Sequence, residues 1–225
     1  MSAEQILIET LMSPVDDIPG STLLDQVCLS ESVSVSKALA GPDRDKWLEA
    51  IMTERKALEK MKVFKRLRRA DLPHGKINIT NIAILLNKKE DGRFKARGVA
   101  LGNRLTHDAS TYSPVPRLAN WRLLMKLAAS GCETIQQHDI STAFLYASLR
   151  EEDGRVFVVP PPEWRETPDE VWELQRALYG LRSAPALFYR TLADTLRKSW
   201  WEVAENEPCL FFSPPIPSGR RVKLL

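Results

Sequence analysis

The sequence predicts an α+β fold in which helices flank a sheet of short, antiparallel strands. Helical segments with one apolar side alternate irregularly with short apolar runs, an Asp-Gly turn joins two of these runs, and no internal repeat is visible. The 225 residues, 44% of them apolar and 27% charged, have the composition of a globular protein. This composition excludes collagen, a coiled coil and a fully disordered chain.

The first 36 residues form an acidic arm that we expect to be disordered. This arm contains six acids and no Lys or Arg, and its short apolar runs follow no sustained period. The acids are Glu4, Glu9, Asp16, Asp17, Asp25 and Glu31. We therefore predict an arm over residues 1–36 and one folded domain over residues 37–225.

A helix is predicted from Asp43 to about Met61, because apolar residues recur on one side of this segment. Asp43 or Asp45 can cap its first turn. The segment that follows, residues 65–76, is rich in Lys and Arg and contains Pro and Gly. We expect it to be a connection without regular structure.

A β-hairpin is the strongest local prediction. Residues 82–86 and 94–101 are short apolar runs, and Asp91-Gly92 lies between them, where Gly accepts the positive φ of a tight turn. Side chains two residues apart on a strand point to the same face and lie about 7 Å apart. The second strand therefore presents a row of cations that suits a phosphate chain, namely Arg93, Lys95 and Arg97.

The second half of the chain is divided by the same patterns. Helices are expected over 117–130 and 183–200, a partly helical segment over 141–149, a turn at Gly180, and strands over 134–140, 156–159, 171–174, 209–212 and 221–225. The strand over 134–140 has an unusually polar interior, Gln136-Gln137-His138-Asp139, which does not suit a strand that only packs in a core.

Positive charge is concentrated in one block of the chain. Residues 60–104 contain thirteen Lys and Arg and three acids, whereas the whole chain has a net charge of +3. Such a block is typical of a surface that binds a polyanion. A solvated basic face without a partner is the alternative.

The cysteines and the hydropathy exclude several classes of protein. Cys28, Cys132 and Cys209 are far apart, and no Cys-x-x-Cys pair occurs, so we expect neither a structural zinc nor a disulfide framework. No run approaches the roughly 20 apolar residues of a membrane span, and no secretory leader is visible. We expect an intracellular protein, cytoplasmic or nuclear, that is not secreted and has no membrane partner.

Four segments follow one another in the folded part, after a helix that carries Trp47 and Glu54: Lys95–Gly102, Tyr112–Val115, Gln137–Leu145 and Leu178–Pro185. Together they resemble the reverse transcriptase of copia-type LTR retrotransposons over roughly residues 37–225. The resemblance implies the fingers and an incomplete palm of the right-hand polymerase fold. It also implies RNA-directed DNA polymerase activity, with an RNA or DNA template-primer and dNTPs as partners and Mg²⁺ as cofactor.

The resemblance also implies roles for individual residues. Asp139 matches the first catalytic, metal-binding carboxylate, beside the backbone carbonyl of Ile140, and hard divalent cations prefer such oxygen ligands. Phe144 matches the aromatic side chain that blocks a ribose 2′-hydroxyl. The other matched nucleotide contacts are Lys95, Arg97, Ala143, Tyr179 and Gly180, and the matched contacts to the nucleic-acid backbone are Lys88, Lys89 and Arg93.

Each match has a plainer alternative. Asp139 could cap a helix or form a turn, Phe144 could belong to an apolar core, and the basic hairpin could be a solvated surface. The sequence also departs from the family pattern, with Ser183 where Gln is usual, Ala186 where Arg is usual, Phe188 where Trp is usual and Gly98 where Leu is usual.

The family's second metal-binding pair, a Tyr-x-Asp-Asp turn, does not occur in the 225 residues. Residues 222–225, Val-Lys-Leu-Leu, match the strand that precedes this turn. Because one carboxylate cannot hold two divalent ions, we expect a reverse transcriptase fragment that is inactive alone. A non-catalytic nucleic-acid-binding module and an inert transposon relic are the alternatives.

Overall fold

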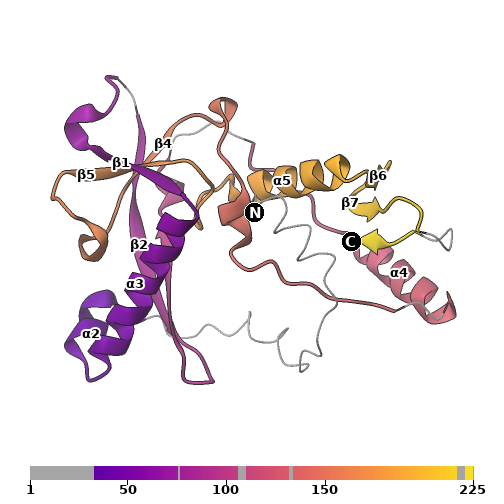
Figure 1. Cartoon of the computed structure of the whole chain (residues 1–225), viewed down its shortest axis with the longest axis horizontal. Helices are drawn as coiled ribbons and strands as arrows, with labels where there is room; N and C mark the ends of the chain where they lie inside the picture. Colours follow the sequence, from indigo (N-terminus) through magenta and orange to yellow (C-terminus); the bar gives the residue numbers. More distant parts are fainter. Residues whose placement is uncertain (1–32, 76, 106–109, 132–133, 217–220, 225) are drawn as a thin grey trace. The chain divides into compact units, whose positions relative to one another are not determined.

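The computed structural model describes residues 33–75, 77–105, 110–131, 134–216 and 221–224 (Figure 1). The predicted acidic arm lies outside these residues as far as residue 32. The described chain divides into two compact units. The five-stranded unit combines residues 33–111 with 144–187, and the three-stranded unit combines residues 112–143 with 188–225.

The five-stranded unit is a mixed sheet with the strand order β1-β5-β4-β2-β3 (Figure 1). Its strands are β1 (Phe64–Arg68), β2 (Asn78–Lys88), β3 (Phe94–Ala100), β4 (Val156–Val159) and β5 (Glu170–Leu174). Every neighbouring pair is antiparallel except β2 and β4, which are parallel. The prediction of an antiparallel sheet is therefore wrong at this pair, and the sheet is mixed. A long connection separates β4 from the β2–β3 hairpin, and long connections permit parallel pairing, whereas tight turns do not.

The predicted hairpin is confirmed, and its strands are longer than expected at β2. Ile82 pairs with Ala100 and Lys88 with Phe94, and the turn contains Gly92 with a φ of +82°. β3 is an edge strand of the sheet, so one side of its backbone faces away from β2.

The basic segment after the first long helix begins with a strand, β1, and a short 3₁₀-helix (Arg69–Asp71), so the prediction of a connection without regular structure is wrong for residues 65–71. The ring of Phe64 on β1 stacks on Trp172 of β5, with centroids 3.6 Å apart. The guanidinium group of Arg66 on the same strand forms ion pairs with three carboxylates. These carboxylates belong to Glu59, Glu166 and Glu170. Tertiary partners thus stabilise β1 in a sequence whose local charge density suggests a loop.

The helices of this unit are α2 (Val35–Ala40) and α3 (Arg44–Lys60). α3 confirms the predicted helix, although the Asp43 carboxylate accepts a hydrogen bond from Lys46 Nζ instead of capping the backbone. α2 extends across the predicted boundary between residues 36 and 37. α3 lies against β3 and buries one apolar side, with Ile51 and Leu58 fully buried.

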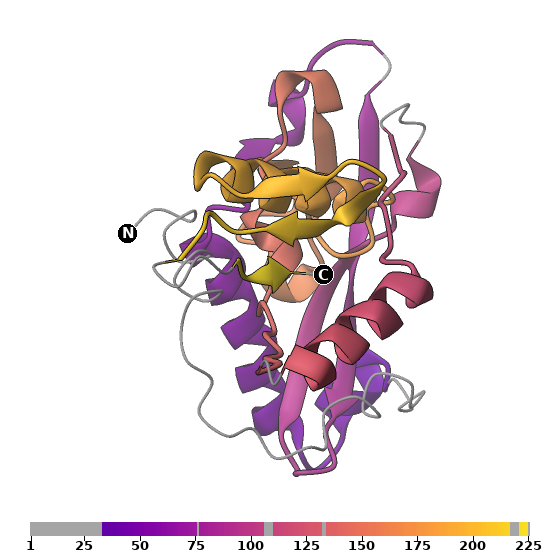
Figure 2. The same cartoon turned by 90° about the vertical axis from the view of Figure 1, so that its right-hand side faces the viewer.

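The three-stranded unit contains the helices α4 (Leu118–Gly131) and α5 (Ala184–Lys198), and α5 begins in the five-stranded unit. Its antiparallel strands are β6 (Glu202–Ala204), β7 (Glu207–Phe212) and β8 (Lys223–Leu224). All of these elements except β6 were predicted from the sequence. Figure 2 shows the three short strands side by side. Ala193, Leu196 and Phe211 form its buried core. The buried carboxylate of Glu207 on β7 accepts a hydrogen bond from Asn120 and thereby ties α4 to the sheet.

The strand predicted over residues 134–140 is not formed. These residues have no regular structure, and none of the strands in the described ranges pairs with them. A single strand without a partner leaves its N–H and C=O groups unpaired, so the extended pattern alone does not produce a strand. The partly helical segment that follows is confirmed as the 3₁₀-helix Ala143–Tyr146. Among the helices described, none combines the length and the apolar character needed to cross a membrane.

Candidate functional site

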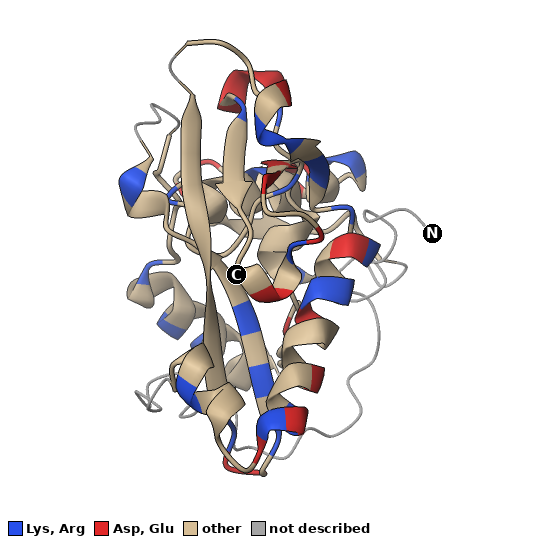
Figure 3. Ribbon diagram, turned by 90° about the vertical axis from the view of Figure 1, so that its left-hand side faces the viewer, with Lys and Arg blue, Asp and Glu red and all other residues tan. Residues whose placement is uncertain are grey.

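The cations of β3 lie on the exposed edge of the five-stranded sheet. Figure 3 shows basic positions that alternate with other residues along this strand, next to α3. Lys95 and Arg97 are exposed, whereas Ala96 between them is buried. The two cations therefore share one face of the hairpin, as the period of two predicts.

The other basic residues of the hairpin are positioned differently. Arg93 lies in the turn, where its guanidinium group binds the Asp91 carboxylate at 2.6 Å and lowers the pKa of that carboxyl. Lys88 pairs with Phe94 across the ladder, and its Nζ atom lies 5.0 Å from the Phe94 ring centroid. Lys88 therefore belongs to the face opposite Lys95. The backbone N–H of Lys89 donates to the Arg93 carbonyl and closes the turn.

Three of the predicted nucleotide contacts lie together in the five-stranded unit. The guanidinium carbon of Arg97 is 4.7 Å from the Tyr179 ring centroid, which is the geometry of a cation–π contact. The Tyr179 and Phe144 rings meet edge to face, with centroids 5.4 Å apart. Segments that are far apart in the sequence thus form one continuous row of a cation and two half-buried rings.

Gly180 holds the turn after Tyr179 against the end of β3. Its φ is +86°, and a Cβ atom added to it would lie 2.1 Å from the carbonyl oxygen of Ala100. The N–H of Ala100 in turn donates to the Tyr179 carbonyl at 2.7 Å. The structure thus gives a reason for glycine at this turn, which is the close packing of two backbone segments.

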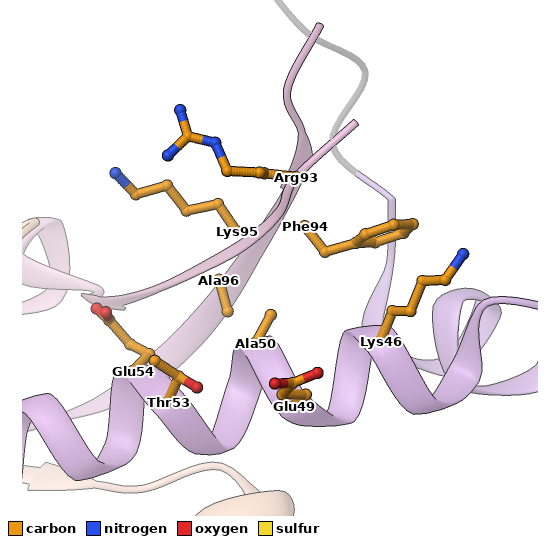
Figure 4. A pocket seen from close by; sticks show the side chains of 9 residues that line it. All are labelled: Lys46, Glu49, Ala50, Thr53, Glu54, Arg93, Phe94, Lys95 and Ala96. Atoms are coloured by element: carbon orange, nitrogen blue, oxygen red, sulfur yellow. The ribbon is translucent and has the colours of Figure 1, made fainter. Parts of the chain in front are cut away.

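A pocket of about 400 Å³ lies between α3 and β3 (Figure 4). The carboxylate of Glu54 rises from α3 toward the strand, and its Oε1 atom accepts a hydrogen bond from the Gly98 N–H at 3.1 Å. Burial raises the pKa of Glu54, against the opposing effects of this hydrogen bond and of the charges on Arg97 and Lys95. Burial also lowers the pKa of Lys95, and the charge of Arg97 lowers it further.

Glu54 was not predicted as a site residue from the sequence. The positions of Trp47, Ile51 and Leu58 define the buried side of α3, and Glu54 falls on the same side by helical spacing. A carboxylate within an otherwise apolar stripe is the signal that points to a specific partner, because burying a charge without one is costly.

Asp139, Ile140 and Ala143 belong to the three-stranded unit, whereas β3 belongs to the five-stranded unit. Asp139 is exposed in the segment without regular structure, and Ala143 begins the 3₁₀-helix. The described residues contain no group of three or more His, Cys, Asp or Glu side chains that could hold a metal ion. One carboxylate and one carbonyl do not fit a pair of divalent ions.

Comparisons with known proteins agree with one another. The family model described as reverse transcriptase (RNA-dependent DNA polymerase) matches residues 64–214. The retrovirus-related Pol polyprotein from transposon TNT 1-94 of Nicotiana tabacum is 28% identical over 193 residues, which cover 81% of this chain and 14% of that protein. The transposon Ty1-MR1 Gag-Pol polyprotein of Saccharomyces cerevisiae is 30% identical over 215 residues, which cover 85% of this chain and 12% of that protein. The chain thus spans about an eighth of the length of these relatives.

Proposed function

Because the chain belongs to the reverse transcriptase (RNA-dependent DNA polymerase) family of copia-type retrotransposon polyproteins, we propose that β3 binds the phosphates of nucleotides for template-directed DNA synthesis. Lys95 and Arg97 are the proposed contacts to the triphosphate of an incoming dNTP. Lys88, Lys89 and Arg93 are the proposed contacts to the backbone of an RNA or DNA template. The family identified from the sequence motifs is confirmed.

The contact between Arg97, Tyr179 and Phe144 carries this proposal. A guanidinium group offers a planar set of donors that matches phosphate oxygens, and its position on a ring restricts its rotamers. Phe144 lies beyond Tyr179, where its ring can exclude the 2′-hydroxyl of a ribose by contact. Gly180 follows Tyr179 in the sequence and Ala143 precedes Phe144, and both remain proposed nucleotide contacts.

We assign the five-stranded unit to the fingers and the segment around Asp139 to the palm of a right-hand polymerase, within one reverse transcriptase domain over residues 37–225. Asp139 and the Ile140 carbonyl are the proposed residues that would hold a first Mg²⁺, and a bound ion would supply stabilisation of the charge on phosphate oxygens. The remaining ligands of a two-ion site are absent from these 225 residues, in which no Tyr-x-Asp-Asp occurs.

A polypeptide of these 225 residues is therefore expected not to extend a primer. A primed homopolymer template and labelled dNTPs test this with Mg²⁺ and with Mn²⁺, and the expected result is no extended product above the protein-free control. The reason is that a single carboxylate cannot hold both metal ions. The several kcal/mol of transition-state stabilisation that these ions supply is then lost. Extended product that disappears in the Asp139→Asn variant would contradict this expectation.

Replacing both proposed triphosphate contacts should also weaken the binding of a nucleic-acid strand, because Lys95 and Arg97 share one exposed face of the hairpin. For the double variant Lys95→Gln, Arg97→Gln, the affinity for a labelled single strand of about 16 nucleotides is expected to fall by about 10- to 100-fold at low salt. The slope of log K against log salt should become less steep by about 1.4, because two phosphate contacts are lost. Fluorescence anisotropy measures both quantities.

The matched control for this double variant is Lys65→Gln, Arg155→Gln. Lys65 lies on β1, at the opposite edge of the same sheet, and Arg155 is exposed beside β4. This control removes the same net charge, so it should retain most of the wild-type affinity. Equal losses in the two double variants would mean that binding is a general effect of charge and not a property of β3.

The basic block favours a second candidate function, a nucleic-acid-binding module without catalysis. Residues 60–104 carry thirteen Lys and Arg against three acids, which is sufficient for sequence-tolerant, salt-dependent binding. Titration with dNTPs separates the two functions. Saturable binding of a dNTP that requires Arg97 supports a polymerase site, and binding of single strands alone supports the module.

A further inference from the structure

We propose that Glu54 is a positioning residue for the Lys95–Arg97 pair, and that its carboxylate makes the binding of polyphosphates at this pair dependent on pH. The inference rests on the proposed phosphate-binding function of β3. It adds a residue from a different element, α3, and a regulatory property that the two cations do not have by themselves.

The Glu54 carboxylate binds the backbone of β3 directly. β3 is an edge strand, so the N–H of Gly98 points away from β2, and Glu54 Oε1 accepts from it at 3.1 Å. Gly98 follows Arg97 directly in the chain. The hydrogen bond therefore fixes the backbone one residue from the guanidinium group, and it connects the edge of the sheet to a helix that is itself anchored in the core by Ile51 and Leu58.

Lys95 and Arg97 are the cations whose charges act on Glu54. Figure 4 shows Lys95 on β3 and Glu54 on α3, on the two sides of the pocket. The other two cations that line it have their own carboxylates, since Lys46 binds Asp43 at 2.8 Å and Arg93 binds Asp91. The second acid in the pocket, Glu49, is exposed one turn earlier on α3. An ionised Glu54 thus offsets part of the positive potential that would attract a phosphate chain to β3.

Protonation of Glu54 should increase the affinity for a polyphosphate. Burial raises the pKa of this carboxyl, so on acidification it becomes neutral at a higher pH than an exposed Glu does. Loss of the negative charge leaves the full charge of Lys95 and Arg97 for the ligand. By linkage, a bound polyphosphate must raise the pKa of Glu54 further.

Inorganic tripolyphosphate is the probe, and calorimetric titration of the full chain measures its affinity over a range from about pH 8 down to the lowest pH at which the chain stays folded. Glu54→Gln is expected to bind it about 3- to 10-fold more tightly than wild type at the upper end of this range, with the two proteins converging as the pH falls. Tripolyphosphate itself titrates in this range, but its titration cancels in the ratio of the two affinities. Glu49→Gln, in the same pocket, is the control and should stay within about 2-fold of wild type throughout.

A positioning role requires one more comparison. Glu54→Ala removes the charge and the acceptor for the Gly98 N–H, whereas Gln keeps the acceptor. Glu54→Ala should therefore bind tripolyphosphate more weakly than Glu54→Gln at every pH. A Glu54→Gln affinity equal to wild type across the range overturns the inference while leaving the phosphate site intact. Absence of binding by wild type overturns the phosphate site, and the role of Glu54 with it.

Discussion

Gly180→Ala is expected to lower the free energy of unfolding by about 3 kcal/mol or more. Two costs add at this position. A φ of +86° is strained for any residue with a Cβ atom, at about 1 kcal/mol or more. The added Cβ would also lie 2.1 Å from the Ala100 carbonyl oxygen, so the turn must move away from β3. Urea unfolding followed by circular dichroism measures the loss.

Gly92→Ala is the matched control for this prediction. Its φ of +82° is nearly the same, but no atom lies within 4 Å of the position that a Cβ would take. It should therefore show the cost of the backbone conformation alone, about 1 kcal/mol. If the two variants lose the same stability, the close approach of Gly180 to β3 contributes nothing, and the account of this turn is wrong.

Trp164→Ala is expected to cost about 3 to 5 kcal/mol of unfolding free energy, as is usual for a large aromatic side chain in a core. Trp164 is 0% exposed, and its indole N–H donates to the Ile51 carbonyl at 3.1 Å. Its six-membered ring covers Gly98, where an added Cβ would lie 2.6 Å from Cη2. Thermal and urea unfolding measure the loss.

A double-mutant cycle that combines Gly98→Ala with Trp164→Ala tests the same contact. In the wild type, Gly98→Ala should cost about 1 to 3 kcal/mol, because the methyl group overlaps the Trp164 ring. In the Trp164→Ala background the same methyl group enters vacated space, so it should cost less or become stabilising. A coupling energy of about 1 kcal/mol or more is expected, and strictly additive effects would contradict the packing described here. The same contact explains why position 98, where the family usually has Leu, holds a glycine in this chain.

Local patterns predicted the elements that local forces determine. α3 follows from its apolar stripe, and the β2–β3 hairpin follows from Asp91-Gly92, because each is specified within a few residues. β1 was not predicted, since the stacking of Phe64 on Trp172 joins segments that are remote in the sequence. The strand over 134–140 was predicted wrongly, because a strand pattern does not supply a pairing partner.

The candidate site could likewise be predicted only in part from the sequence. The shared face of Lys95 and Arg97 follows from the period of a strand, and the motif resemblance drew attention to Phe144 and Tyr179. Their contact with Arg97 is a tertiary property that no local pattern contains. Glu54 was visible in the sequence only as part of a matched helix, and its role depends on the edge position of β3.

The strand order of the five-stranded sheet has a kinetic consequence. Phe64 of β1 pairs with Leu174 of β5, so the sheet closes only when two distant stretches of chain meet. Such non-local pairing costs loop-closure entropy before it gains contacts, and it slows folding. The β2–β3 hairpin can form early from local contacts, whereas on the ribosome β1 must wait, with its hydrogen-bonding groups unpaired, until β5 has been synthesised. During that interval β1 is the part of the sheet most exposed to incorrect pairing.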